Sequence, residues 1–453
     1  MFSSIGKIHF VGIGGSGMSG IAEVLINLGY IVVGSDIKVT GIVKHLQSLG
    51  AEIFIGHSEK NVADDVALMV TSTAISMQNP EVRFASLKNI PIIRRSEMLA
   101  ELMRLKYSIL VAGTHGKTTT TSIISWLMHE LNMDPTIVIG GCLNGIGSGA
   151  KLGKGKFFVA EADESDGSFL KYNPIVAVLT NIDNDHLDYY GDMDQLKQAF
   201  QSFIDKVPFY GFNVLCNDDK IVRELAVKTN RKTITYGIDN PSSLMAENIK
   251  VEGGFVTFNV KFSGEILGEV QLPIPGRHNI LNALAAMAVL LTLNVDFKKI
   301  TGIIKDFQGV GRRLELKGQK DEVFVVDDYG HHPTEMYMTY QAVKEFWCDY
   351  DKYVIFQPHR YSRTKILAKE FADVLSCMDR VLLLPIYAAS EENNDNISVD
   401  TILKHMSNAE NVSCFSDVES LQEYLQANIK GKAVVLTLGA GDVYKVGEAF
   451  LDV

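Results

Sequence analysis

The chain of 453 residues has few cysteines and no long hydrophobic run. Its five cysteines are odd in number and scattered, at Cys142, Cys216, Cys348, Cys377 and Cys414. They form no CxxC pair, which favours free thiols in a reducing compartment over a disulfide framework. No stretch is long and apolar enough to cross a bilayer, and the glycine-rich N-terminus is not typical of a signal peptide. We therefore expect a cytoplasmic protein that is not embedded in a membrane.

Positively charged residues are also fewer than negatively charged ones. Lys and Arg number 43 against 54 Asp and Glu, for a net charge of −11. This balance disfavours broad binding to nucleic acid or to an anionic membrane surface. Repeats and low-complexity tracts are absent from the sequence, and its apolar fraction of 46% is ordinary for a globular protein. The length predicts two to four domains.

Three successive segments alternate apolar runs with helical patterns. We predict an α/β protein of three domains: a Rossmann-like parallel sheet in 1–106, a P-loop ATPase-type domain in 107–312 and a Rossmann-like domain in 313–453. The expected strands are 8–13, 31–34, 67–72, 108–112, 157–160, 175–180, 323–327, 353–357, 381–385 and 433–438. The expected helices are 18–28, 120–131, 334–346 and one from Asn279. Residues 242–269 are typical of antiparallel strands, with Gly253-Gly254 as a hairpin turn.

A glycine loop lies between the expected strand 108–112 and the helix that follows it. It consists of Gly113, Thr114, His115, Gly116, Lys117, Thr118 and Thr119. In this context backbone N–H groups and the helix N-terminus bind phosphate oxygens. Lys117 is placed for the β- and γ-phosphates of ATP, and the Thr118 hydroxyl for Mg²⁺. Val111 stands where a standard Walker loop has its first glycine, so the loop is a shortened variant; a plain glycine turn is the alternative.

Acidic clusters follow the next two expected strands. Glu161-Ala-Asp-Glu-Ser-Asp166 follows one, and Asn181-Ile-Asp-Asn-Asp-His186-Leu-Asp188 follows the other. Parallel strands end at one edge of a sheet, where α/β proteins bind ligands. Carboxylates suit Mg²⁺, so the sequence predicts a metal site there instead of two solvated loops.

Another glycine motif follows the first expected strand. Gly12, Gly14, Gly15, Ser16 and Gly17 form a GxGxxG pattern. Asp36 comes 19 residues after Gly17, which suits a ribose hydroxyl. The motif indicates a nucleotide diphosphate and fits either NAD or a nucleotide sugar.

Candidate residues also occur in the third segment. His331-His332 follows the expected strand 323–327 and precedes Pro333, where a capped turn is the alternative interpretation. Arg360 and Arg363 lie three residues apart and could bind a carboxylate or phosphate, or simply begin a solvated helix.

Together these motifs resemble the Mur ligases of peptidoglycan synthesis over essentially the whole chain. The matching stretches, in the family's order, are HFVGIGGSGMSGIA, AGTHGKTTTT, EADESDGSFL, TNIDNDHLDYYG, PGRHNILNALAA, GVGRRLE, DDYGHHPTE and FQPHRYSRT. Within the family the resemblance is to the branch that adds L-alanine to UDP-N-acetylmuramate, with ATP and Mg²⁺ as cofactors.

The resemblance implies roles for individual residues. The first glycine motif and Asp36 would bind the UDP-sugar, and Lys117 the transferring phosphate. The implied metal ligands are Thr118, Glu161 and His186. The implied ATP contacts outside the loop are Asn279, Arg313 and Asp328, with Asn282 a further candidate. The implied residues at the amino-acid end are Tyr329, His331, Arg360 and Arg363, and either His331 or Asp328 would take the amine proton.

Three other functions remain open at this point. A recycling ligase that adds an intact peptide to the same sugar shares most of the motifs. An NAD-dependent oxidoreductase would explain the first glycine motif but not the second. A nucleotide-binding regulator would bind ATP without turnover. The sequence predicts no oligomeric state.

Overall fold

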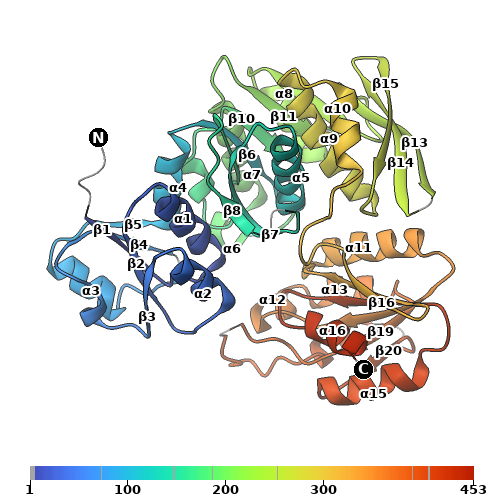
Figure 1. The fold of residues 1–453 in the computed structure, drawn as a ribbon. Coiled ribbons are helices and arrows are strands. Elements are labelled where there is room, and N and C mark those ends of the chain that lie inside the picture. Colours follow the sequence, from blue (N-terminus) through green and yellow to red (C-terminus); the bar gives the residue numbers. More distant parts are fainter. Residues whose placement is uncertain are drawn as a thin grey trace. The chain divides into compact units, whose positions relative to one another are not determined.

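The computed structural model describes residues 6–72, 74–145, 148–185, 187–252, 254–389, 391–406 and 409–452. These residues form three sheets, of five, ten and six strands (Figure 1). The chain divides into two compact units. The first comprises Met1–Glu247, Asn259–Val270 and Leu281–Phe307, and the second Asn248–Phe258, Gln271–Ile280 and Gln308–Val453.

The five-stranded sheet lies in the first unit and is parallel, in the order β3-β2-β1-β4-β5. Its strands are β1 Lys7–Val11, β2 Val32–Asp36, β3 Glu52–Ile55, β4 Val66–Thr71 and β5 Ile92–Arg94. Its helices are α1 Ser16–Asn27, α2 Gly41–Ser48, η1 Glu59–Asn61, α3 Pro80–Leu87 and α4 Arg95–Met103. The expected parallel sheet is confirmed. Each of its strands is followed by a helix, and this alternation of strand and helix is typical of a parallel sheet.

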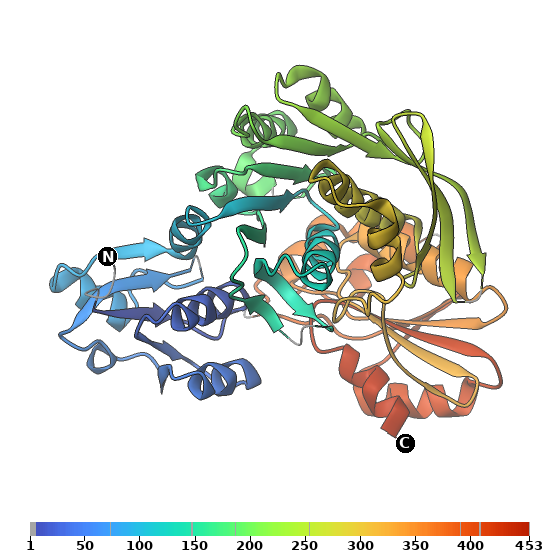
Figure 2. The same cartoon turned by 45° about the horizontal axis from the view of Figure 1, so that its top comes forward.

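The ten-stranded sheet has the order β15-β14-β13-β12-β11-β10-β6-β9-β7-β8. Its strands are β6 Tyr107–Ala112, β7 Thr136–Leu143, β8 Ser148–Lys151, β9 Phe157–Glu161, β10 Val176–Leu179, β11 Phe212–Cys216, β12 Thr233–Gly237, β13 Leu244–Glu252, β14 Phe255–Phe262 and β15 Glu265–Leu272. Its helices are α5 Lys117–Glu130, η2 Ser168–Lys171, α6 Leu187–Tyr190, α7 Met193–Asp205, α8 Lys220–Lys228, α9 Arg277–Thr292 and α10 Phe297–Ile304. Helix α5 packs along β6, β7 and β9 (Figure 2).

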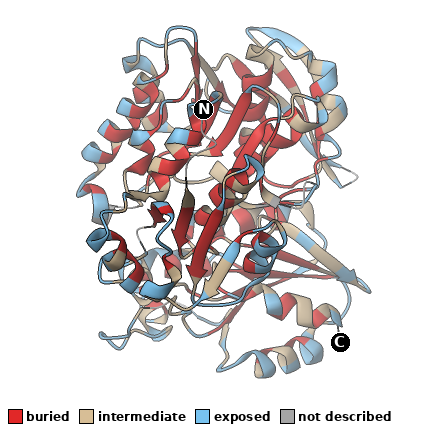
Figure 3. Ribbon diagram, turned by 60° about the vertical axis from the view of Figure 1, so that its left-hand side comes forward, coloured by how far each residue is buried: buried red, intermediate tan, exposed pale blue. Residues whose placement is uncertain are grey.

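Strands β10, β6 and β9 are neighbours in the middle of this sheet and run parallel. They are buried almost throughout (Figure 3), as apolar strands covered on both faces must be. Their carboxyl ends therefore meet at one edge, as the sequence predicted. The predicted strands 242–269 are present as β13 to β15, and Gly253 of the predicted hairpin turn lies outside the described residues.

The six-stranded sheet lies in the second unit, in the order β16-β17-β21-β18-β19-β20. It is parallel except for β16, which pairs antiparallel with β17. Its strands are β16 Glu315–Lys320, β17 Val323–Asp328, β18 Asp351–Phe356, β19 Arg380–Leu383, β20 Val412–Cys414 and β21 Ala433–Leu438. Its helices are α11 Pro333–Phe346, α12 Tyr361–Ile366, α13 Ala368–Leu375, α14 Asp400–Leu403, α15 Val418–Asn428 and α16 Tyr444–Asp452.

Two other expectations concern the chain as a whole. Among the described residues, no helix has both the length and the apolarity needed to cross a membrane. Cys216, Cys348, Cys377 and Cys414 are free thiols. The three-domain α/β fold class predicted from the sequence is confirmed.

Candidate functional site

The loop between β6 and α5 has the backbone shape of a phosphate loop. Gly113 has φ +128° and Gly116 has φ +81°, values that favour glycine. Neither position has room for a side chain: a Cβ on Gly113 would overlap the Thr180 hydroxyl, and one on Gly116 would lie 2.6 Å from Asn282 Oδ1. Gly116 is also the N-cap of α5 and provides no side-chain acceptor. Free backbone N–H groups at the start of α5 therefore remain for a ligand.

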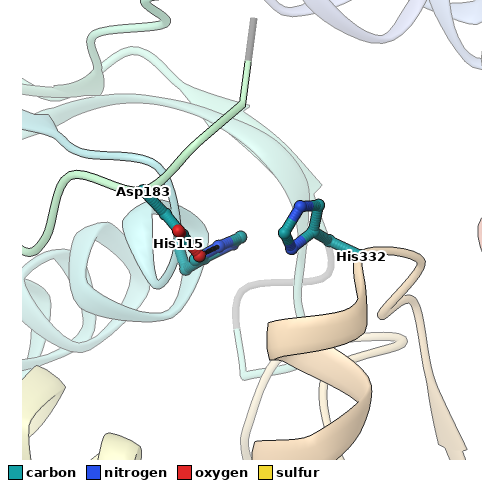
Figure 4. A group of neighbouring side chains, drawn as sticks. All are labelled: His115, Asp183 and His332. Atoms are coloured by element: carbon teal, nitrogen blue, oxygen red, sulfur yellow. Dashed lines mark hydrogen bonds and ion pairs between the residues drawn. The ribbon is translucent and has the colours of Figure 1, made fainter. Parts of the chain in front are cut away.

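The end of β10 holds this loop in place. The Thr114 N–H donates to the Asn181 carbonyl oxygen (3.0 Å), and the His115 N–H donates to Asn181 Oδ1 (2.8 Å). Asn181 Nδ2 donates in turn to the His115 carbonyl oxygen (3.0 Å). The His115 ring faces the Asp183 carboxylate at 3.2 Å (Figure 4). The segment that follows β10 thus fixes the conformation of the loop that follows β6.

Lys117 is paired with a buried carboxylate. Its Nζ lies 2.9 Å from both carboxylate oxygens of Glu164 and also donates to the Gly113 and Thr114 carbonyl oxygens. Burial by itself would lower the pKa of Lys117, but the charges of Glu164 and Asp163 outweigh it and hold that pKa above its usual value. Lys117 therefore remains an ammonium group, the form that a phosphate requires.

Thr118 and Glu161 lie together as the predicted metal ligands must. The Thr118 hydroxyl donates to Glu161 Oε2 at 3.1 Å, and Glu161 Oε1 accepts from the Gly140 N–H at 2.8 Å. A hydroxyl and a carboxylate that already converge beside a phosphate loop fit Mg²⁺, which prefers oxygen ligands. His186, the third predicted ligand, lies outside the described residues.

The first glycine motif connects β1 to α1. The Gly14 N–H donates to Asp36 Oδ2 at 2.8 Å, so Asp36 orders the loop from the end of β2. Helix α1 begins at Ser16, whose side chain lies outside the described part, with Gly15 as N-cap and no acidic residue in its first turn. The fold therefore presents an uncapped helix N-terminus, which suits a diphosphate.

In the second unit, the end of β17 carries a buried carboxylate. Asp328 is 5% exposed and accepts from the Leu314 N–H (2.8 Å) and the Gly330 N–H (2.7 Å). Burial raises the pKa of Asp328 to about 6, although the nearby Arg313 opposes this. The Arg313 guanidinium lies 5.2 Å from the Tyr329 ring centroid and forms an ion pair with Glu335 at 3.8 Å. Arg313, Asp328 and Tyr329 thus lie close together at the end of β17.

His331 lies beside this group with its proton on a defined nitrogen. Its Nδ1 is 3.1 Å from the Tyr329 carbonyl oxygen, which can only accept, so Nδ1 carries the proton and Nε2 is the basic nitrogen. Burial lowers the pKa of His331 to about 4, with Glu335 opposing and Arg363 adding to the shift. The ring is therefore neutral at physiological pH.

Arg360 and Arg363 lie at the start of α12, close to His359. Arg363 Nη1 is 3.4 Å from His359 Nδ1, and the His359 and His331 ring centroids are 5.9 Å apart. Arg360 is exposed and has φ +72°, an uncommon value for a residue with a side chain. Burial, and then the charges of His331, Arg363 and Arg360, lower the pKa of His359 to about 4. Both arginines thus act on His359, and Arg363 also acts on His331, while the carboxylates of Glu335 and Glu391 oppose them.

The remaining predicted positions have local partners. His332 caps α11 (Figure 4), so the capped-turn interpretation is correct for His332 while His331 joins the cluster. Asn279 Nδ2 donates to the Pro275 carbonyl oxygen at 2.7 Å. Asn282 Oδ1 accepts from the Thr120 hydroxyl at 3.1 Å and supports the start of α5.

Several residues in these clusters were not predicted individually, among them Glu164, Asn181, Glu335 and His359. Glu164 and Asn181 lie in the two acidic strand ends that the sequence singled out. Glu335 occupies the third helical position after His332, the position of the glutamate in a capping box. His359 has no local signal apart from its place at the end of a strand.

Comparison with known proteins gives matches along the whole chain. Models of the Mur ligase family catalytic domain, the Mur ligase middle domain and the Mur ligase glutamate ligase domain match residues 7–107, 111–290 and 312–441. A UDP-N-acetylmuramate–L-alanine ligase from Endomicrobium trichonymphae is 51% identical over 100% of this chain and 99% of its own length. One from Geobacter sulfurreducens is 49% identical over 100% of this chain and 98% of its own length.

Solved structures agree. The UDP-N-acetylmuramate-alanine ligase from Thermotoga maritima superposes with a TM-score of 0.84 at 29% identity, covering 99% of this chain and 98% of its own. A murein peptide ligase from Psychrobacter arcticus has the same fold, with a TM-score of 0.72 at 24% identity over 99% and 98% of the two chains. Because the three family models match most of the chain and relatives at about 50% identity cover all of it, the chain belongs to the Mur ligase family.

Proposed function

We propose that this protein joins L-alanine to the carboxylate of UDP-N-acetylmuramate, with ATP converted to ADP and phosphate, in peptidoglycan precursor synthesis. One observation carries the chemical part of this proposal. Lys117 and Thr118, adjacent in one loop, each face a glutamate from the end of β9, Glu164 and Glu161. Two relatives at 49–51% identity over the full chain support L-alanine as the acceptor.

The reaction begins with activation of the sugar carboxylate, whose oxygen is a poor leaving group. Transfer of the γ-phosphoryl group to it gives an acyl phosphate, which the amine of L-alanine attacks through a tetrahedral oxyanion. The loop 113–119 would bind the phosphates through its backbone N–H groups, and the Lys117 ammonium would neutralise charge on the transferring group. Mg²⁺, held by Thr118, Glu161 and His186, would supply further charge neutralisation.

For the amine step we assign the base to His331. Both oxygens of Asp328, the other candidate, accept backbone N–H groups, whereas Nε2 of a neutral His331 has a free lone pair. Tyr329 and Arg363 lie beside His331, and Arg360 lies three residues before Arg363; these three would orient the carboxylate ends of the substrates.

Other assignments follow the same proposal. The first glycine motif with Asp36 would bind the UDP-sugar, and Asn279, Arg313 and Asp328 would contact ATP. We propose functional boundaries at 1–106, 107–312 and 313–453, and the family-model matches to 7–107, 111–290 and 312–441 support this proposal. We place the protein in the cytoplasm, where its nucleotide substrates occur.

The test is ADP release with UDP-N-acetylmuramate while the acceptor is varied among L-alanine, a tripeptide and none. We expect turnover with L-alanine. Equal phosphate release with the tripeptide would favour the recycling ligase, and ATP binding without acceptor-dependent ADP would favour a regulator. Tight NADH binding that the UDP-sugar does not displace would favour an oxidoreductase.

A further inference from the structure

Arg95 lies against the first turn of α1 in an unusual way. A Cβ added to Gly17 would fall 2.8 Å from Arg95 Cζ and 3.0 Å from its Cδ, so the guanidinium occupies the space that a side chain at position 17 would fill. Arg95 is the first residue of α4, whereas Gly17 is the last glycine of the GxGxxG motif. The third glycine of such a motif normally permits close packing of the helix on its sheet. In this chain it makes room for a cation.

The Arg95 guanidinium makes few polar contacts with the described part of the chain. Its side chain is 25% exposed, and among the described residues its one ion pair is with Asp163 Oδ2 at 4.0 Å. That distance is too long for a hydrogen bond. Asp163 Oδ1, in turn, is engaged by the Ser165 N–H at 3.0 Å. A half-buried arginine without a hydrogen-bonded acceptor in the described part of the chain has its donors free for a ligand.

Arg95 lies near both the proposed UDP-sugar site and the proposed ATP site. It lies at the uncapped N-terminus of α1 and near Asp163, next in sequence to Glu164, the partner of Lys117. Helix α1 also packs against β7 and β8 of the ten-stranded sheet, in the same compact unit. Arg95 is thus close both to the first glycine motif and to the acidic segment that contains the partner of Lys117.

From this geometry we infer that Arg95 binds the diphosphate of the UDP-sugar, as a side-chain complement to the backbone N–H groups of the first glycine motif. The inference rests on the proposed function. A diphosphate at the N-terminus of α1 meets the planar, bidentate donors of a guanidinium, which match phosphate oxygens. The lactyl carboxylate of the sugar is an anion too, but the contact with Gly17 places Arg95 at the diphosphate end.

The test compares the Kd of four ligands for the wild type and Arg95→Ala: uridine, UDP, UDP-N-acetylglucosamine and UDP-N-acetylmuramate. Uridine lacks the diphosphate, and UDP-N-acetylglucosamine lacks the lactyl carboxylate. We expect the three diphosphate ligands to bind about tenfold to a hundredfold more weakly to the variant, because it loses charged hydrogen bonds to the diphosphate. The Kd of uridine should be unchanged. Arg95→Lys keeps the positive charge but loses the bidentate donors of the guanidinium, so its Kd values for the diphosphate ligands should lie between those of the wild type and Arg95→Ala.

The matched control is Arg104→Ala. Arg104 follows the last residue of α4 directly, is 65% exposed and pairs with Glu101, so its loss should leave all four affinities unchanged. Thermal unfolding of each variant separates lost binding from lost folding. UDP-N-acetylmuramate affinity within twofold of the wild type in a folded Arg95→Ala would overturn the inference, as would a loss confined to that one ligand. A wild type that does not bind UDP-N-acetylmuramate would instead overturn the proposed function.

Discussion

The ammonium group of Lys117 is equidistant from both carboxylate oxygens of Glu164, at 2.9 Å. Glu164 is 1% exposed, so this is a buried ion pair inside the phosphate loop. The Lys117 ammonium is therefore already paired within the protein. The phosphates of ATP must replace Glu164 as its partner or share the ammonium with it.

Lys117→Ala should abolish ligation while the UDP-sugar still binds. Removal of a donor to a developing negative charge costs about a hundredfold to a thousandfold in kcat. ADP release measures the loss, and titration with UDP-N-acetylmuramate checks the retained site. A Lys117→Ala enzyme with a kcat near that of the wild type would refute the role of the loop.

The same substitution removes the Lys117 ammonium from the buried Glu164 carboxylate, and breaking a buried ion pair in this way costs about 3–5 kcal/mol of stability. The double variant Lys117→Ala/Glu164→Ala should recover much of that loss in thermal unfolding but none of the activity. Recovery of both would show that Lys117 acts through folding alone.

Thr118→Ala should weaken the response to Mg²⁺, whereas Thr118→Ser should not. The hydroxyl of Thr118 is 3.1 Å from Glu161 Oε2, and serine retains that hydroxyl. We expect the Mg²⁺ concentration for half-maximal activity to rise about tenfold or more in the alanine variant, since even an outer-shell partner of a metal ligand is worth that much. Identical Mg²⁺ curves for the alanine and serine variants would exclude Thr118 as a ligand.

The central part of the site could be predicted because its signals are local. A strand, a glycine loop and a helix are contiguous in 107–130, and the acidic runs directly follow β9 and β10. What the sequence could not decide is which carboxylate faces which partner. Glu161 and Glu164 are three residues apart at the end of one strand, yet one meets Thr118 and the other meets Lys117.

Other features depend on contacts between distant segments. The clustering of His359 with His331 follows from the order β17-β21-β18, in which a strand from the end of the chain separates the two strands that precede these residues. Arg95 directly follows β5, which pairs with β4, and β4 in turn pairs with β1, the strand that precedes the loop of Gly17. Short motifs do not encode the order of the strands in a sheet.

Gly116→Ala should impair both folding and ATP binding. A φ of +81° costs an alanine about 1–2 kcal/mol, and the new Cβ would lie 2.6 Å from Asn282 Oδ1, which accepts from the Thr120 hydroxyl. We expect a lower free energy of unfolding and a higher KM for ATP. Gly302→Ala is the control: Gly302 lies within α10 with open space around it, so alanine should stabilise the protein by up to about 1 kcal/mol. Equal stability of the two variants would contradict the left-handed, crowded geometry of Gly116.

His331 should make stability depend on pH between about 4 and 6.5. Burial lowers its pKa to about 4 in the folded protein, against about 6.5 in the unfolded chain. The unfolded state therefore binds more protons in this window, so the contribution of a neutral His331 is fully present above pH 6.5 and is lost as the pH falls to 4. Its upper limit is about 3 kcal/mol. Asp328, whose pKa is raised to about 6, acts in the opposite direction, so only a comparison with a variant isolates His331.

Urea unfolding of the wild type and His331→Gln at pH 4.5 and pH 7 provides that comparison. The variant lacks the titrating ring, so its free energy of unfolding should fall less than that of the wild type between pH 7 and pH 4.5. His405→Gln, at an exposed position of the same unit, should follow the wild type at both pH values. Ligation by His331→Gln should be slow at both, because the glutamine amide has no basic nitrogen for the amine proton. If His331→Gln and the wild type lose the same free energy of unfolding on acidification, His331 is not held neutral by its surroundings, and its assignment as the base loses its physical ground.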